Sequence, residues 1–138
     1  MSPSPSARSV AFTEVAATSQ AQDDSGEMLV VGTTDAARAK IADLVPNATA
    51  PSGRVLVAVF QGQRNTGGYS IAITAIERNG DQLVVRATFG VPDPGAMVTQ
   101  VLTSPAHIVS IAAADAAGVR EAILVDSTGT LHLRINTT

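Results

Sequence analysis

Apolar residues recur along this chain in short runs, and most of the runs have the length of a β-strand. The run Arg54–Phe60 is nearly all apolar, which is typical of a central strand that is buried on both faces. In Leu131–Ile135 the apolar residues alternate with His132 and Arg134, which is typical of a half-exposed antiparallel strand. The sequence predicts strands at Ser9–Val15, Glu27–Val31, Arg54–Phe60, Ser70–Arg78, Gln82–Phe89, Met97–Leu102, Ala106–Ile111, Glu121–Val125 and Leu131–Ile135.

A helical period marks the stretch after the second of these strands. Apolar side chains recur there at i, i+4 and i+7, in the order Ala37, Ile41 and Leu44. Thr33 or Thr34 can act as the N-cap, and Asp35 lies in the first turn, where a carboxylate suits the helix dipole. Pro46 then ends the pattern. The sequence predicts one helix, from Thr34 to Leu44.

Turn residues divide the other runs. Asn79-Gly80 is the strongest signal, because a type I′ hairpin turn needs positive φ at both central residues. Asp126–Gly129 indicates a second hairpin at the C-terminal end, and Ala112–Gly118 is interpreted as a loop of small residues.

These elements predict an α+β fold that is mainly antiparallel β. We expect a single domain with a sheet-like or sandwich-like architecture, one packing helix and a C-terminal hairpin. The predicted domain spans residues 9–138, and residues 1–8 are expected to form a flexible leader rich in Ser and Pro.

Charge and composition narrow the set of partners. The net charge is −3, whereas nucleic acids and anionic membrane surfaces are bound through clustered Lys and Arg. No apolar run approaches the roughly 20 residues that span a bilayer, and residues 1–8 lack the apolar segment of an export signal. The chain has no cysteine, which excludes disulfides, thiolate metal sites and a cysteine nucleophile. We expect no nucleic-acid partner and no membrane span.

The two histidines are the first candidates for catalysis. His132 alternates with apolar neighbours and is predicted to lie on the solvent face. His107 could act as a general base, but the nucleophile pattern Gly-x-Ser-x-Gly is absent, and Ser104 is only a nearby hydroxyl. A triad scattered along the chain stays an alternative, and it requires His107 to hydrogen-bond both a hydroxyl and a carboxylate.

The acidic residues suit turns and caps better than a catalytic pair or a metal site. No spacing of acids matches a calcium loop, and no His-x-x-x-His occurs. We therefore expect a non-enzymatic domain with no catalytic residue, no metal and no cofactor. The acids that the sequence places in turns, caps or loops are Asp23, Asp24, Asp35, Asp81, Asp93, Asp115 and Asp126.

The stretch Gly62–Tyr69 lies between two of the clearest strand signals. It resembles a phosphate-binding loop only weakly, since it lacks Gly-Lys-Ser/Thr and precedes a strand instead of a helix. One interpretation is a structural corner, in which Gly67 and Gly68 supply positive φ and Tyr69 covers the core. The other interpretation is a loop that docks on a protein partner, because Tyr and Arg favour such contacts. The candidate partner-binding residues are Arg64, Asn65, Thr66, Gly67, Gly68 and Tyr69.

The same stretch carries a resemblance to a known family. Val55–Ile76 contains a strand, a glycine, Thr-Gly-Gly-Tyr and a second strand, and this order resembles the PrcB C-terminal domain family. The likeness continues through Pro92–Gly95, Val98–Pro105 and His107–Val109, so that residues 55–111 form the PrcB-like core.

The resemblance implies a small, non-catalytic bacterial domain of the cell envelope or of secreted proteins. It also implies a protein partner, namely a protease, because the family takes its name from an accessory subunit of a protease complex. A looser similarity links Asn65–Tyr69 to the inhibitory loop of chagasin-like protease inhibitors, although this chain lacks their proline. Inhibition of a cysteine protease is therefore the alternative function.

Overall fold

Nine strands and two helices make up the described part of the chain. The computed structural model describes residues 8–18, 26–45, 53–64, 67–92, 95, 97 and 103–137. The strands are β1 (Arg8–Ser9), β2 (Phe12–Thr18), β3 (Met28–Val31), β4 (Arg54–Phe60), β5 (Ser70–Asn79), β6 (Gln82–Gly90), β7 (Ala106–Ala112), β8 (Glu121–Val125) and β9 (Leu131–Asn136). The helices are α1 (Asp35–Leu44) and α2 (Ala113–Ala116).

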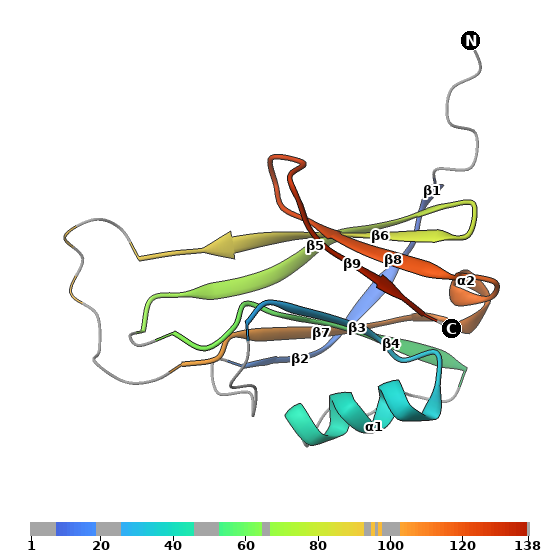
Figure 1. Cartoon of the computed structure of the whole chain (residues 1–138), viewed down its shortest axis with the longest axis horizontal. Helices are drawn as coiled ribbons and strands as arrows, with labels where there is room; N and C mark the ends of the chain where they lie inside the picture. Colours follow the sequence, from blue (N-terminus) through green and yellow to red (C-terminus); the bar gives the residue numbers. More distant parts are fainter. Residues whose placement is uncertain are drawn as a thin grey trace, which may run out of the picture.

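The strands form two sheets that stack face to face (Figure 1). Sheet A has the order β1–β5–β6–β8–β9, and sheet B has the order β2–β7–β4–β3. Every pairing is antiparallel except that of β6 with β8. The predicted α+β sandwich with a C-terminal hairpin is therefore confirmed.

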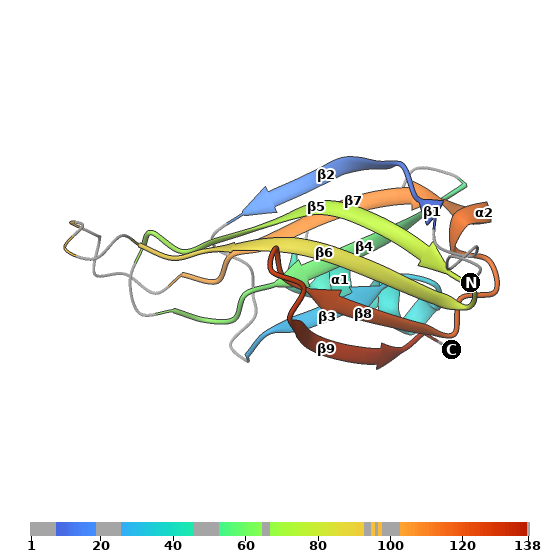
Figure 2. The same cartoon turned by 90° about the horizontal axis from the view of Figure 1, so that it is seen from above.

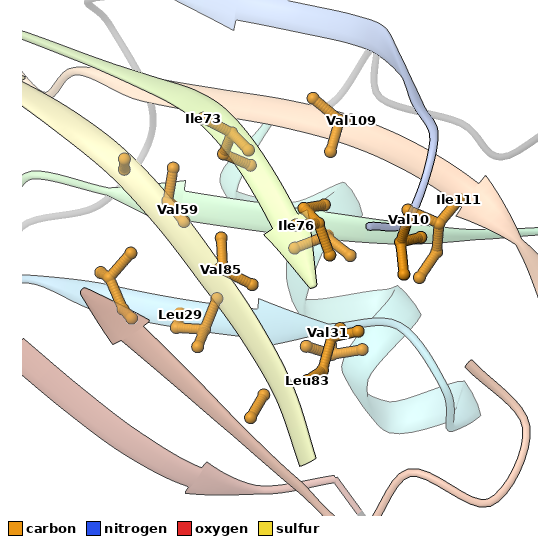
Figure 3. Packing of buried hydrophobic residues seen from close by; sticks show 14 of the residues in the cluster. Val10, Leu29, Val31, Val59, Ile73, Ile76, Leu83, Val85, Val109 and Ile111 are labelled. Carbon is orange, nitrogen blue, oxygen red and sulfur yellow. The ribbon is translucent and has the colours of Figure 1, made fainter. Parts of the chain in front are cut away.

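The main core lies between the sheets and consists of aliphatic side chains (Figure 3). From sheet A, Ile73 and Val85 point into it, and Val59 and Val109 point into it from sheet B. Because the side chains of β4 alternate, Val59 faces this core while Phe60 faces the other side of sheet B. The apolar run Arg54–Phe60 is thus a central strand buried on both faces, as predicted.

Helix α1 covers the outer face of sheet B (Figure 1). The Thr34 side chain accepts a hydrogen bond of 3.1 Å from the backbone N–H of Ala37, which confirms Thr34 as the N-cap. Ile41 is fully buried and packs in a second cluster with Leu56 and Phe60 of β4. The single apolar face of the helix is therefore used against the sheet, as its spacing predicted.

Several predicted boundaries change, and the predicted strand Ser9–Val15 is divided between β1 of sheet A and β2 of sheet B. The stretch Ala112–Gly118 is not only a loop, because Ala113–Ala116 form the one-turn helix α2, and Ala is the best helix former. Arg8 was assigned to the leader, but in β1 it pairs with Arg78. Of the predicted strand Met97–Leu102, residues 98–102 lie outside the described residues, and Met97 is exposed and not in a strand.

The N-terminal strand passes from one sheet to the other. β1 pairs with β5 in sheet A, and β2 pairs with β7 in sheet B (Figure 2). Between them the backbone N–H of Val10 donates to the carbonyl of Ile76, and the Val10 side chain is buried. This crossing covers one end of the region where β5 of sheet A and β7 of sheet B face each other. At the opposite edge, the Thr33 hydroxyl donates a hydrogen bond of 2.7 Å to the carbonyl of Thr137.

Gly62, two residues after the end of β4, is required for two physical reasons. Its φ of +96° lies in the left-handed region, and a Cβ at this position would lie 3.0 Å from the carbonyl carbon of Gly26. We predict that Gly62→Ala lowers the free energy of unfolding by more than the ~1–2 kcal/mol of left-handed strain alone. Gly129→Ala is the matched control, since Gly129 has a φ of +87° and no neighbour within 4 Å. Urea denaturation of both variants tests this, and equal losses would contradict the role of the Gly26 contact.

Candidate functional site

His107 is a buried link between the two sheets. It belongs to β7 of sheet B, and its Nδ1 accepts a hydrogen bond of 2.8 Å from the backbone N–H of Ile73 on β5 of sheet A. Its Nε2 lies 2.8 Å from Oε1 of Glu14 on β2. Since a backbone N–H can only donate, Nδ1 is unprotonated here, and Nε2–H donates to the Glu14 carboxylate. Both ring nitrogens are therefore engaged.

These contacts differ from those of a catalytic triad. The triad hypothesis requires a hydroxyl and a carboxylate on His107, and a carboxylate is present at Glu14. The other nitrogen bonds the backbone N–H of Ile73 instead of a hydroxyl. The Ser104 hydroxyl is buried and hydrogen-bonds no described residue. The described contacts of His107 link sheet B to sheet A.

The prediction that His132 lies on the solvent face is wrong. Its side chain is 21% exposed and makes contacts on both ring nitrogens. The alternation rule fails here because β9 contains a β-bulge: Leu133 pairs with Leu124 and Leu131 with Val125, which leaves His132 as the extra residue. A bulge turns a side chain away from the face that strict alternation assigns to it.

The ring of His132 is held by one aromatic ring and two carboxylates. It stacks on Phe89 of β6, with ring centroids 4.4 Å apart and planes 9° from parallel. Its Nδ1 lies 2.9 Å from Oε1 of Glu27, and its Nε2 lies 2.9 Å from Oδ2 of Asp126. Glu27 directly precedes β3 of sheet B, so this contact joins the sheets at the edge opposite His107.

The two carboxylates favour the charged form of His132. The hydrogen bond with Asp126 raises the pKa of His132 above its ordinary value of 6.5, and Glu27 acts in the same direction. Hydrogen bonds from the Thr128 hydroxyl and from His132 hold the pKa of Asp126 well below its ordinary range. Asp126 also accepts from the backbone N–H groups of Thr128 and Thr130, which forms the predicted turn between β8 and β9.

The structure places four of the six candidate partner-binding residues: Arg64, Gly67, Gly68 and Tyr69. Asn65 and Thr66 lie outside the described residues. The guanidinium of Arg64 lies over the Tyr69 ring, 4.9 Å from its centroid. Gly68 has a φ of +90°, so it supplies the positive φ that a corner needs. Tyr69 is half-buried, so the described residues of this stretch combine a positive-φ corner at Gly68 with a partly exposed ring at Tyr69.

Backbone hydrogen bonds join this stretch to the connection between β6 and β7. The Arg64 N–H donates to the carbonyl of Thr103 at 2.7 Å, and the Thr103 N–H donates to the carbonyl of Arg64 at 2.8 Å. Gln61 donates from its side chain to the carbonyl of Gly90 at 2.9 Å. Both connections therefore meet at one end of the sandwich (Figure 1).

Tyr69 forms part of a groove between the sheets. The groove has a volume of about 290 Å³ and is mostly apolar. Its walls come from the end of β2, the start of β5 and the start of β7: Ala17, Thr18, Tyr69, Ser70, Ile71, Pro105 and Ala106. Ala106 directly precedes His107, so the groove lies next to the hydrogen bond that joins His107 of β7 to Ile73 of β5.

The sequence contains little that could have indicated the histidine contacts. Glu14 and His107 are 93 positions apart, and Glu27 and His132 are 105 positions apart. Within the described residues, no cluster of His, Asp and Glu is suited to a metal ion. In the same part of the chain, no helix is long and apolar enough to cross a bilayer.

Comparison with known families confirms the resemblance found in the sequence. The family model described as PrcB C-terminal matches residues 55–112, which run from β4 to the end of β7. No curated protein and no solved structure matches the chain. The matched segment contains Arg64, Tyr69 and His107.

We predict that His107→Leu destabilises the fold. The substitution removes the acceptor of a buried N–H and leaves Ile73 unpaired, which costs about 1–3 kcal/mol. Glu14→Gln is the control, because the Glu14 side chain is 66% exposed and the amide oxygen can still accept. Its effect is expected to be within about 0.5 kcal/mol. The free energy of unfolding in urea checks both values. Wild-type stability for His107→Leu would contradict the role of the bond between His107 and Ile73 in holding the two sheets together.

We also predict a pH-dependent stability from His132. Because its pKa is raised on folding, its contribution is fully present below the unfolded value of 6.5 and is lost as pH rises through the folded pKa. The pKa of Asp126 is lowered, so its contribution is present above 3.8 and is lost as pH falls. Wild type should therefore lose its advantage over His132→Gln as pH rises above 6.5 in urea denaturation. Parallel profiles for the two proteins would refute this assignment.

Proposed function

We propose that this chain, whose residues 55–112 match the PrcB C-terminal family, is a non-enzymatic protein-interaction domain that serves as an accessory subunit of a protease complex. The observation that carries the proposal is the Arg64–Tyr69 pair beside an apolar groove. The proposal includes a location in the cell envelope or outside the cell, as the resemblance implies.

The geometry of the pair supports a contact surface. Stacking on the Tyr69 ring restricts the long Arg64 side chain before any partner binds, so less conformational entropy is lost on binding. Tyr and Arg are also the side chains that contribute most to binding energy in protein interfaces. A pre-ordered Arg–Tyr pair therefore favours a protein partner.

Exposed apolar side chains lie on the neighbouring connection. Three large apolar side chains stand out as exposed among the described residues, and two of them, Val91 and Met97, belong to the connection between β6 and β7. Val91 is 65% exposed and Met97 is 100% exposed. Since this connection is bonded to Arg64 through Thr103, the apolar surface and the Arg64–Tyr69 pair belong to the same end of the molecule.

The described contacts of the histidines support a non-enzymatic role. His107 bonds Ile73 and Glu14, and His132 bonds Glu27 and Asp126. No described hydroxyl is bonded to either ring. The inhibitor alternative depends on Asn65 and Thr66, which lie outside the described residues, and no described contact favours it.

We predict that the Arg64→Ala/Tyr69→Ala double variant loses its partner. The tagged chain is cross-linked in an envelope fraction of the bacterium that encodes it, and the captured proteins are identified by mass spectrometry. Wild type is expected to capture a protease, and the double variant to lose about ten-fold or more of that signal, as for a hot-spot residue. Arg120→Ala is the control, because Arg120 is exposed and lies outside the site.

Unchanged capture by the double variant would remove the site assignment. Capture of proteins without any protease, lost in the same variant, would contradict the protease-complex assignment and leave the contact surface intact.

A further inference from the structure

We propose that the edge of β5 at Ile71 takes up an extended, acidic segment of the protein partner as an added β-strand. The inference deepens the proposed function and rests on it, because it assigns the chemistry of the partner at the same end of the molecule. Strand addition is a common mode of peptide recognition, in which backbone hydrogen bonds supply affinity and side-chain contacts supply specificity.

The edge of β5 opposite β6 is only partly paired. In the described residues, β1 pairs with β5 only at Glu77 and Arg78, and Val10 adds one bond to Ile76. The other half of this edge faces sheet B. Its one described partner is His107, whose Nδ1 accepts from Ile73. His107 therefore occupies the place that the carbonyl of a neighbouring strand would take.

The register of β5 shows where the next edge groups lie. In an antiparallel pair, residues alternate between those that bond the partner strand and those that point away from it. Ile73 pairs with Ala87 in register, but its N–H points to His107 and hence away from β6. Ile71 is two residues earlier with no register shift between them, so its N–H and C=O point to the same edge. No described residue bonds these two groups.

The groove lies along this edge. It is lined by Ser70 and Ile71 of β5, by Ala17 of the edge strand β2, and by Pro105 and Ala106 at the start of β7. In the described part of the chain, no strand pairs with the outer side of β2. An extended segment in the groove would pair with the same edge of β5 that β1 pairs with. Its apolar side chains would be covered by Ala17 and Pro105.

The charge at the ends of the groove sets the chemistry of the segment. The guanidinium of Arg64 lies over the Tyr69 ring, which forms part of the wall, and it makes no ion pair with a described carboxylate. Arg64 as a whole is only partly buried, so a carboxylate of the incoming segment can reach its guanidinium and form a charge-assisted hydrogen bond. Glu14 carries the opposite charge at the His107 end. The acidic residue of the segment therefore lies at the Tyr69 end.

A phage-displayed library of random nonapeptides provides the probe. The library is panned on immobilised wild-type protein after depletion on Ala17→Trp, whose exposed indole fills the groove. Thr13→Trp is the matched control, because Thr13 is exposed on the same strand and does not line the groove. Circular dichroism of each variant verifies the fold, and Arg64→Glu provides a second variant that leaves the groove unfilled.

We expect enriched peptides to alternate apolar and polar residues and to carry Asp or Glu near one end. Synthetic copies should shift the Ile71 amide resonance saturably and bind Thr13→Trp like wild type. Their dissociation constant should rise about ten-fold for Arg64→Glu, as for loss of a charge-assisted hydrogen bond. Lys in place of the acidic residue should restore binding to Arg64→Glu.

Three outcomes would overturn the inference: no enrichment over the Ala17→Trp depletion, enriched peptides without an acidic residue, or binding that leaves the Ile71 amide unshifted. If the partner protein is still lost on Arg64→Ala/Tyr69→Ala in these cases, the proposed function stands and only strand addition fails. If the peptides bind as expected but Arg64→Ala/Tyr69→Ala still captures the partner, strand addition stands and the assignment of the Arg64–Tyr69 pair as the partner site fails.

Discussion

The hydrogen bond from the Ile73 N–H to Nδ1 of His107 is the constraint on which this sandwich depends at its β5–β7 edge. The chain crosses from β1 in sheet A to β2 in sheet B. Beyond this crossing, no described strand pairs with the edge of β5 opposite β6. A buried N–H without an acceptor would be costly there, and a β-bulge between Ile73 and Ala75 adjusts the strand beside the bond. The imidazole is long enough to reach from β7 to β5, so this bond links the two sheets, and the groove begins at Ala106, one residue before His107.

The opposite edge is held by a different kind of interaction. His107 uses a neutral nitrogen toward a backbone N–H, whereas His132 lies between the carboxylates of Glu27 and Asp126 and stacks on Phe89. The contact of His132 depends on the charge of its ring and hence on pH. The Asp126 end of this contact is fixed by the β8–β9 turn, and the Glu27 end lies against Gly62. Gly62 therefore places the chain after β4 against Glu27, whose carboxylate contacts His132.

Much of the fold could be predicted because its signals are local. The apolar run Arg54–Phe60 corresponds to β4, and Thr34 caps the helix as expected. A hairpin joins β5 to β6 as predicted, but the type I′ turn centred on Asn79-Gly80 is wrong: Asn79 pairs with Gln82, and Gly80 and Asp81 form the turn with positive φ only at Gly80. The site was predictable only in part. Arg64 and Tyr69 are close in sequence, so their pairing follows from a short corner, but the groove is assembled from three strands that are distant along the chain.

The two histidines show why the remainder could not be predicted. The alternation of Leu131–Ile135 placed His132 in solvent, and only the pairing register with β8 reveals the bulge. For His107, the decisive partner is a backbone N–H, which no residue type in the sequence can indicate. The short helix α2 was missed because one turn is too short to show a helical period.

Amide hydrogen exchange at two residues of β5 tests the central claim most directly. If His107 ends the paired part of this edge, the Ile73 amide is protected in the free protein, while the Ile71 amide exchanges at least about ten-fold faster, although both side chains are buried. Equal protection at the two amides would mean that another group already occupies the edge at Ile71, and the account of the groove as an unpaired strand edge would be wrong.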